Sequence, residues 1–312
     1  MSRIPIIIDT DPGQDDALAI LLALAGSDRL DLLGITTVAG NVSLDLTTAN
    51  ALRILEVAGR PDVPVYLGAS RPLLRKLCTA EYICGPDGLE GANLPAPTIK
   101  PREQHAVAFI IETLRKAPDR SITLCPIGPL TNLALVFAQE PALAAKVARI
   151  AMMGGARDMG NITPAAEFNF YVDPHAAQIV LQLGVPIVMF GLHATHQAVC
   201  TLEHVAKITA LESKVARAVA GMTSRPRPGA KVKLGVQGHP QHDPCVIAWL
   251  LWPELFTGRD CHVAVETCSE GTIGRSTIDW WGSTRRPANA HVIERIDADG
   301  FFERLIAALA TF

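Results

Sequence analysis

The sequence predicts an α/β fold in which a mostly parallel sheet is flanked by helices. Apolar, strand-like runs alternate with amphipathic helices through the first two-thirds of the 312 residues, which is typical of parallel strands joined by helical crossovers. The first run, residues 4–8, is β-branched and apolar apart from Pro5, as expected for a strand buried on both faces. The length is compatible with one large domain or two small ones. Since no linker or repeat divides the chain, we expect one domain over residues 1–312.

The elements can be assigned in order along the chain. After the first strand, apolar residues recur at helical spacing over residues 14–24. The other predicted strands are residues 30–38, 63–67, 121–126, 147–153, 185–192, 261–267, 275–280 and 291–296. The other predicted helices are residues 44–58, 105–117, a helix opened by 128–132, 174–183, 245–251 and 301–310. Asp173 precedes Pro174, so we expect it to cap the helix that follows.

Two segments show neither pattern. Residues 71–101 are irregular and rich in Gly, Pro and Leu, and residues 222–242 are rich in Gly and Pro with no Phe, Tyr or Trp. Connections of this length are more often functional loops than filler. We therefore expect both segments to be mobile loops at the active site.

Composition excludes several functional classes. The formal net charge of −3 and an aromatic content of 5% argue against nucleic-acid binding. The seven cysteines include no CxxC pair and are odd in number, which favours buried thiols in a reducing compartment. No apolar run reaches the length of a membrane span, and the first strand begins too early for a signal peptide. We expect a soluble, cytoplasmic protein.

The most informative feature is a cluster of four carboxylates within eight residues: Asp9, Asp11, Asp15 and Asp16. Asp11 stands at the expected N-cap position of the first helix, with Pro12 at its first helical position. Capping and the helix dipole account for one or two of these acids but not for four. Their position at the carboxyl end of a strand, where α/β sheets bind ligands, predicts a metal or catalytic cluster.

Further polar residues lie where other predicted strands end or where a predicted helix begins, and in a parallel sheet they would face the same edge as the acidic cluster. These are Asn41, Asn161, Glu167, Asn169, His242 and Asp243. Carboxylate and amide oxygens suit calcium or magnesium rather than zinc, and they also suit sugar hydroxyls.

Each of these residues has a plainer structural interpretation. Asp243 before Pro244 is equally compatible with an N-cap, and His242 with a surface histidine. Asn41 and Asn161 each follow a glycine, as in ordinary turns. Glu167 and Asn169 are harder to explain in this way, since strand-like alternation would place both side chains on one face.

The chain resembles the inosine–uridine-preferring nucleoside hydrolases over essentially its whole length. The long family signature Asp-x-Asp-Pro-Gly-x-Asp-Asp-Ala is present at residues 9–17. The later family motifs appear in order at residues 38–41, 128–132, 153–155, 161–169 and 242–244. The resemblance implies a Rossmann-like α/β domain and a homodimer or homotetramer.

The resemblance also implies one calcium ion as cofactor. Asp11, Asp16 and Asp243 would supply carboxylate ligands, and Ile127 its backbone carbonyl. The residues matching the substrate-binding positions are Asp15, Asn41, Met153, Asn161, Glu167 and Asn169, to which we add His239 of the segment 222–242.

The implied reaction is hydrolysis of the N-glycosidic bond of ribonucleosides, giving ribose and a free nucleobase in nucleoside salvage or catabolism. Asp11 would act as general base on a metal-bound water. The transition state would resemble an oxocarbenium ion. His242 would protonate or hydrogen-bond the departing base, because its ordinary pKa of about 6.5 suits a general acid near neutrality.

The sequence departs from the family pattern at three places. Cys84 stands where the family often has His, and His193 where it often has Asp. The family's aromatic residue in the segment 222–242 is absent. That segment instead offers Arg225, Arg227, Lys231, Lys233, Gln237 and His239. Recognition of the base, purine or pyrimidine, is therefore the part of the resemblance that transfers least.

Two alternatives remain open from the residues alone. A haloacid-dehalogenase-like phosphatase also begins with a strand and an Asp-x-Asp motif, although Asp15, Asp16 and the later Asn–Glu–Asn group argue against it. The second alternative is a ribose- or nucleoside-binding protein without turnover, which the intact acids at positions 11, 16 and 243 disfavour. Release of ribose from nucleosides would distinguish a hydrolase from both of these alternatives.

Overall fold

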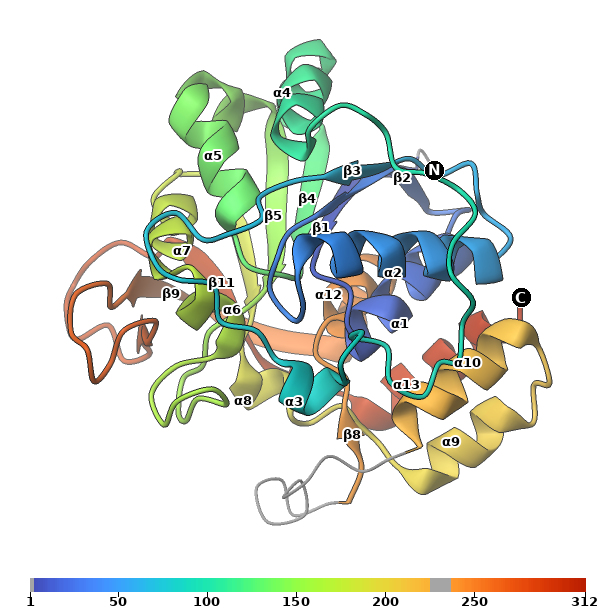
Figure 1. Ribbon diagram of the computed structural model, residues 1–312. Coiled ribbons are helices and arrows are strands. Elements are labelled where there is room, and N and C mark those ends of the chain that lie inside the picture. Colours follow the sequence, from blue (N-terminus) through green and yellow to red (C-terminus); the bar gives the residue numbers. More distant parts are fainter. Residues whose placement is uncertain (1–2, 225–236) are drawn as a thin grey trace.

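A computed structural model describes residues 3–224 and 237–312 and shows a nine-stranded sheet with helices on both faces (Figure 1). The strands lie in the order β10-β9-β11-β6-β5-β4-β1-β2-β3, and a separate two-stranded ribbon joins β7 to β8. The main-sheet strands are β1 Ile4–Thr10, β2 Leu30–Thr37, β3 Val65–Leu67, β4 Ile122–Pro126, β5 Val147–Met153, β6 Ile187–Phe190, β9 Phe256–Val265, β10 Ser276–Asp279 and β11 Ala290–Ile296. The ribbon strands are β7 Val199–Cys200 and β8 His239–Pro240. All pairings from β11 to β3 are parallel, and β9 pairs antiparallel with both β10 and β11.

The two faces of the sheet support two separate apolar cores, and the first strand contributes to both. Ile6 and Ile8 belong to one core, and Ile7, between them, belongs to the other, because successive side chains of a strand point to opposite faces. The first core is covered by α1 Gln14–Ala25, α2 Leu44–Val57, α9 Leu202–Thr209, α10 Lys214–Thr223, α12 Pro244–Leu251 and α13 Ala298–Leu309. The second is covered by α4 Ala106–Lys116, α5 Thr131–Gln139 and α7 Pro174–Leu181.

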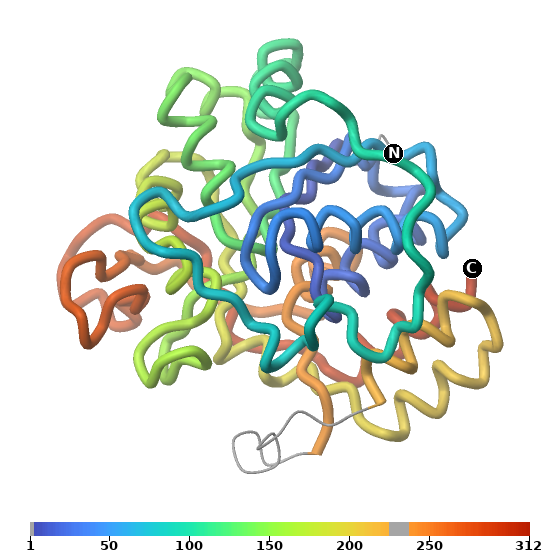
Figure 2. Tube along the Cα trace, viewed as in Figure 1, coloured from blue at the N-terminus to red at the C-terminus, as the bar shows by residue number. Residues whose placement is uncertain are grey.

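The strand order places a crevice between β1 and β4. From β1 the chain proceeds outward through β2 and β3, and it then returns to β4 and proceeds the other way through β5 and β6 (Figure 2). In open α/β sheets, ligands bind at such a switch point, outside the carboxyl ends of the strands. Asp11 follows β1 and Ile127 follows β4, so both residues lie at this point.

The predicted fold class is confirmed, and most predicted elements are found within a few residues of their expected ends. The strand over residues 147–153 matches β5 at both ends, and Asp173 caps α7 by accepting from the amide of Ala176. The short elements α3 Glu81–Cys84, α6 Phe168–Val172 and α8 Leu192–Thr195, together with α9 and α10, were not predicted. No helix among residues 3–224 and 237–312 has the length and apolar character needed to cross a bilayer.

Two local predictions were wrong. Asp11 does not cap the first helix: Gly13 is the N-cap, and the Asp16 side chain accepts from the Gly13 amide. Glu167 and Asn169 do not alternate along a strand, because Glu167 is the N-cap of α6 and Asn169 lies in its first turn. In both cases a side chain satisfies a free amide at a helix start.

The two predicted loops have different outcomes. Residues 71–101 contain one short helix, α3, and otherwise no regular element. Within 222–242, Met222 and Thr223 belong to the last turn of α10 and His239 to β8. Residues 225–236, which include Arg225, Arg227, Lys231 and Lys233, lie outside the described residues.

Candidate functional site

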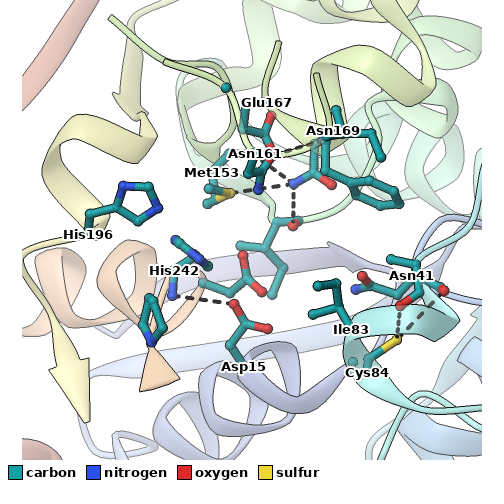
Figure 3. Close-up of a pocket in the computed structure, with 18 of the residues that line it drawn as sticks. Asp15, Asn41, Ile83, Cys84, Met153, Asn161, Glu167, Asn169, His196 and His242 are labelled. Atoms are coloured by element: carbon teal, nitrogen blue, oxygen red, sulfur yellow. Dashed lines mark hydrogen bonds between the residues drawn. The ribbon is translucent and has the colours of Figure 1, made fainter. Parts of the chain in front are cut away.

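A pocket opens at the carboxyl edge of the sheet, and most of the residues singled out from the sequence line it (Figure 3). Those that do are Asp15, Asn41, Ile127, Met153, Asn161, Glu167, Asn169, His242 and Asp243. Asp11 and Asp16 lie just beneath its surface, with 1% and 0% exposure. His239 does not line it. The pocket therefore gathers side chains from both halves of the chain, up to the start of α12.

The Asp11 carboxylate is buried with one oxygen satisfied and one unsatisfied. Its Oδ2 accepts from the amide of Asn41 at 2.7 Å, whereas Oδ1 has no hydrogen-bond partner among the described residues. Two glycines allow the chain to approach it so closely: a Cβ at Gly40 would lie 2.1 Å from Oδ2, and one at Gly128 would lie 2.5 Å from Oδ1. An unsatisfied buried carboxylate oxygen is costly, so Oδ1 is suited to a cation or to a water that it deprotonates.

Asp16 is held more completely than Asp11. Its Oδ1 accepts from Thr10 Oγ1 at 2.5 Å, and its Oδ2 accepts from the Gly13 amide at 2.9 Å and from Asn41 Nδ2 at 3.2 Å. These bonds fix the carboxylate at the start of α1, beside Asp15. Asn41 Nδ2 also donates to the backbone carbonyl oxygen of Asp11 at 3.1 Å. The Asn41 side chain therefore bonds to both Asp11 and Asp16.

Asp15, Asp16 and Asp243 form a group that could hold a metal ion. One carboxylate oxygen from each lies within 4.8 Å of the others, and all three residues are buried. Asp243 stands at the N-cap position of α12, yet its side chain makes no capping hydrogen bond, so its carboxylate is left for the site. The notable difference from the expected ligand set is that Asp15 takes the place of Asp11 in this group.

Burial and mutual repulsion raise the pKa of the acids in this cluster. The pKa of Asp16 rises to about 6, and those of Asp11 and Asp243 rise well above the usual range, in each case chiefly because burial disfavours the charge and further because neighbouring aspartates repel it. The candidate ligands gathered here are carboxylate and carbonyl oxygens, which is the donor set of a hard divalent cation. Such an ion would offset the repulsion and keep the carboxylates charged.

Glu167 and Asn169 are positioned at the N-terminus of α6, where Glu167 is the N-cap and Asn169 lies in the first turn. Glu167 accepts from the amides of Gly155 and Asn169, both at 2.8 Å, and burial raises its pKa to about 7. Asn169 Nδ2 donates to the carbonyl oxygens of Ile127 at 2.9 Å and Met153 at 3.2 Å. The Ile127 carbonyl keeps a second lone pair for another partner.

His242 stands opposite this amide-rich wall. Its Nδ1 lies 2.7 Å from Thr195 Oγ1, its backbone amide donates to Asp15 Oδ2 at 3.3 Å, and the ring of His196 lies edge-on with centroids 5.4 Å apart. The imidazole is thus held from the scaffold side and presented to the pocket. His196 was missed from the sequence, although it follows the strand predicted at 185–192 and the same edge rule would have found it.

Two of the three departures from the family pattern, Cys84 and His193, lie in different places. Cys84 lines the pocket together with its neighbour Ile83, and its thiol donates to the Ala80 carbonyl at 3.1 Å. His193 is not among the lining residues: its Nδ1 accepts from the Arg157 amide at 3.2 Å, and burial lowers its pKa to about 4. Cys84 thus bears on what enters the pocket, whereas His193 packs within the fold.

His239 lies behind the wall of the pocket rather than in it. The ring is 2% exposed, with Nε2 at 3.0 Å from Gln14 Oε1 and Nδ1 at 3.0 Å from Gln241 Nε2. Apolar and aromatic lining residues from the segment 71–101, Tyr82 among them, were also not predicted. Their signal in the sequence is weak, because isolated apolar residues in a long loop resemble ordinary loop packing.

Comparisons with known proteins agree with this geometry. The model of the family described as inosine-uridine preferring nucleoside hydrolase matches residues 6–303. A pyrimidine-specific ribonucleoside hydrolase, RihA of Shewanella sp. (strain ANA-3), is 48% identical, over 100% of this chain and 98% of its own length.

Solved structures give the same result. A plant nucleoside hydrolase, the PpNRh1 enzyme, superposes with a TM-score of 0.89 at 31% identity over 100% of both chains. A purine-preferring ribonucleoside hydrolase from Gardnerella vaginalis superposes with a TM-score of 0.90 at 29% identity over 98% of both chains.

Proposed function

Because this chain belongs to the inosine–uridine preferring nucleoside hydrolase family, we propose that it is a ribonucleoside hydrolase that cleaves the N-glycosidic bond and releases ribose and a free nucleobase. The observation that carries the proposal is the buried Asp11 carboxylate with its unsatisfied Oδ1, beside a group of three further aspartates. A sugar-binding protein would not need so costly an arrangement of buried negative charge.

We propose calcium as the cofactor. Asp16 and Asp243 would hold it with Asp11, the Ile127 carbonyl has a lone pair to spare, and Asp15 lies close enough to join them. When bound, the ion supplies positive charge that keeps the carboxylates ionised and lowers the pKa of water. The all-oxygen donor set and the unsatisfied Asp11 Oδ1 support this assignment.

Asp11 is the proposed general base. It would take a proton from the water that attacks the anomeric carbon, while the bond from that carbon to the base nitrogen breaks. The positive charge that develops on the sugar would be stabilised by the carboxylates of Glu167 and the aspartates. Asn41, Asn161 and Asn169 line the same part of the pocket and would hold the ribose hydroxyls.

His242 is the proposed proton donor to the leaving base. The Thr195 hydroxyl bonds to Nδ1, so we assign proton donation to Nε2, the other ring nitrogen. The nitrogen released from the sugar would receive its proton there, and the electron pair of the broken bond would remain on the base. His196 adds a second imidazole to the same wall.

We further propose a preference for pyrimidine ribonucleosides, since the relative at 48% identity is named pyrimidine-specific and the structure named purine-preferring is only 29% identical. The deciding assay measures ribose release from uridine, cytidine, inosine and adenosine, with and without a calcium chelator. No ribose from any nucleoside would refute the proposed activity. Activity that survives full chelation would refute the cofactor, and faster release from inosine than from uridine and cytidine would refute the preference.

A further inference from the structure

Gln14 has no role in the proposed chemistry, yet both ends of its side chain are engaged. It is the first residue of α1, between Gly13 and Asp15, and it is 7% exposed. Its Nε2 donates to the backbone carbonyl of Glu90 at 2.9 Å, and its Oε1 lies 3.0 Å from His239 Nε2. One side chain thus joins segments 76 residues and 225 residues away in the sequence.

The chemistry of these partners fixes the direction of each hydrogen bond. The Glu90 carbonyl only accepts, so the amide nitrogen of Gln14 must face it and the amide oxygen must face His239. That oxygen only accepts, so His239 Nε2 must carry a hydrogen. Its Nδ1 lies 3.0 Å from Gln241 Nε2 and 3.1 Å from the Pro240 carbonyl oxygen. The Gln14 amide therefore fixes a hydrogen on His239 Nε2 and holds the ring in its orientation.

The two partners of Gln14 belong to opposite walls of the pocket. The Glu90 amide donates to the Cys84 carbonyl at 3.1 Å, and Cys84 lines one wall. His239 belongs to β8, and Pro240 of the same strand lines the pocket with nearby His242. Figure 3 shows Cys84 on one side of the pocket and His242 on the other, with Asp15 between them.

We propose that Gln14 is a positioning residue that sets the separation of these two walls and thereby the affinity for the nucleobase. The inference rests on the proposed function, since it takes the base as the occupant of this half of the pocket. The ribose half is held by other bonds, those of Asn41 to Asp16 and of Asn169 to Ile127. Loss of the Gln14 amide should therefore weaken binding of the base and leave binding of ribose unchanged.

The test is Gln14→Met, which keeps the length of the side chain and removes both hydrogen bonds. We expect KM for uridine and inosine to rise about tenfold, equivalent to about 1.4 kcal/mol and similar to the loss of one or two hydrogen bonds. The kcat should change by less than about twofold, and the inhibition constant of ribose should not change. Gln104→Met is the matched control, because Gln104 does not line this pocket and its side chain bonds to Glu112; it should change none of the three.

Three results would overturn the inference: no rise in KM, an equal rise in KM and in the ribose inhibition constant, or the same effect in Gln104→Met. If Gln14→Met does not fold, His239→Met removes the partner on one wall and should raise KM in the same selective way. Wild-type protein that releases no ribose would instead refute the proposed function. In that case hydrogen exchange still tests whether Gln14 holds the two walls together. The amides of residues 85–92 and 237–241 should exchange faster in Gln14→Met than in the wild type, and unchanged exchange would overturn the inference.

Discussion

Removal of divalent cations should lower the thermal stability of this protein more at neutral than at acidic pH. The reason is the buried group of Asp15, Asp16 and Asp243 beside Asp11. Burial and the neighbouring charges raise the pKa of Asp16 from 3.8 to about 6. Since the folded state binds this proton more tightly than the unfolded chain does, the stability that Asp16 contributes is fully present below about pH 3.8 and is lost as the pH rises through about 6.

The size of the effect can be estimated from Asp16 alone. A shift of about two pKa units costs about 3 kcal/mol at pH 7, at about 1.36 kcal/mol per unit. An unfolding entropy of about 2.1 cal/mol/K per residue amounts to about 0.65 kcal/mol/K for this chain, so the cost corresponds to about 5 °C in Tm. A bound cation offsets it, because binding to the folded state alone stabilises that state.

The assay is a set of thermal melts with excess calcium and with EDTA, at about pH 7 and at about pH 4.5. We expect Tm at the higher pH to be about 5 °C or more higher with calcium, and the difference to shrink to a fraction of that at the lower pH. If EDTA leaves Tm unchanged at neutral pH, or lowers Tm more at acidic pH than at neutral pH, the reasoning is refuted.

Asp243→Asn supplies the matched variant. The Asp243 side chain makes no capping hydrogen bond at α12, so the substitution removes a buried charge and leaves the helix start intact. The variant should melt at a higher temperature than the wild type in EDTA, gain less from calcium, and lose ribose release. A variant less stable than the wild type in EDTA would show that repulsion among these acids is not what costs stability.

Three further predictions concern single side chains of the site. Asp11→Ala should lower kcat/KM for uridine by at least about 10³-fold, within the range for loss of a general base; a folded variant with near wild-type ribose release would remove Asp11 from that role. His242→Ala should slow nucleosides by about 10²-fold or more and p-nitrophenyl riboside far less, because nitrophenolate leaves without a proton; equal losses on both substrates would argue against proton donation. Gly40→Ala should abolish ribose release and cost about 1–3 kcal/mol in denaturant melts, because its Cβ would lie 2.1 Å from Asp11 Oδ2; full activity would show that this contact relaxes.

The sheet and the position of the site at its edge were predictable because both follow from simple periodicities. Alternating β-branched runs and helical spacings define the parallel sheet, and parallel strands present their carboxyl ends together. The acidic cluster could be located in the same way, since capping explains too few of its members. The distant residue Asp243 was harder to assign, because Asp before Pro is equally an N-cap signal, and only the structure shows that its side chain makes no cap.

Local assignments failed where side chains outweighed backbone preference. Asp11 has the sequence context of an N-cap, but its carboxylate bonds to the Asn41 amide, and Asp16 satisfies Gly13 instead. His239 was expected at the substrate as one of the polar residues of the segment 222–242. The structure turns its ring toward Gln14, a contact across 225 residues that no local pattern encodes.

The irregular segment that follows β3 is fastened to the scaffold at both of its ends. The Leu73 amide donates to the buried Asp173 carboxylate at 2.8 Å, and the Arg102 amide donates to the Val65 carbonyl at 2.8 Å. Between these anchors the chain supplies pocket residues such as Cys84 but no strand of the sheet. Between its ends the segment is also bonded to α1 and α2, where Gln14 donates to the Glu90 carbonyl and Asn50 to the Asp87 carbonyl. One wall of the pocket is thus a loop held by the helices that lie beside the acidic cluster.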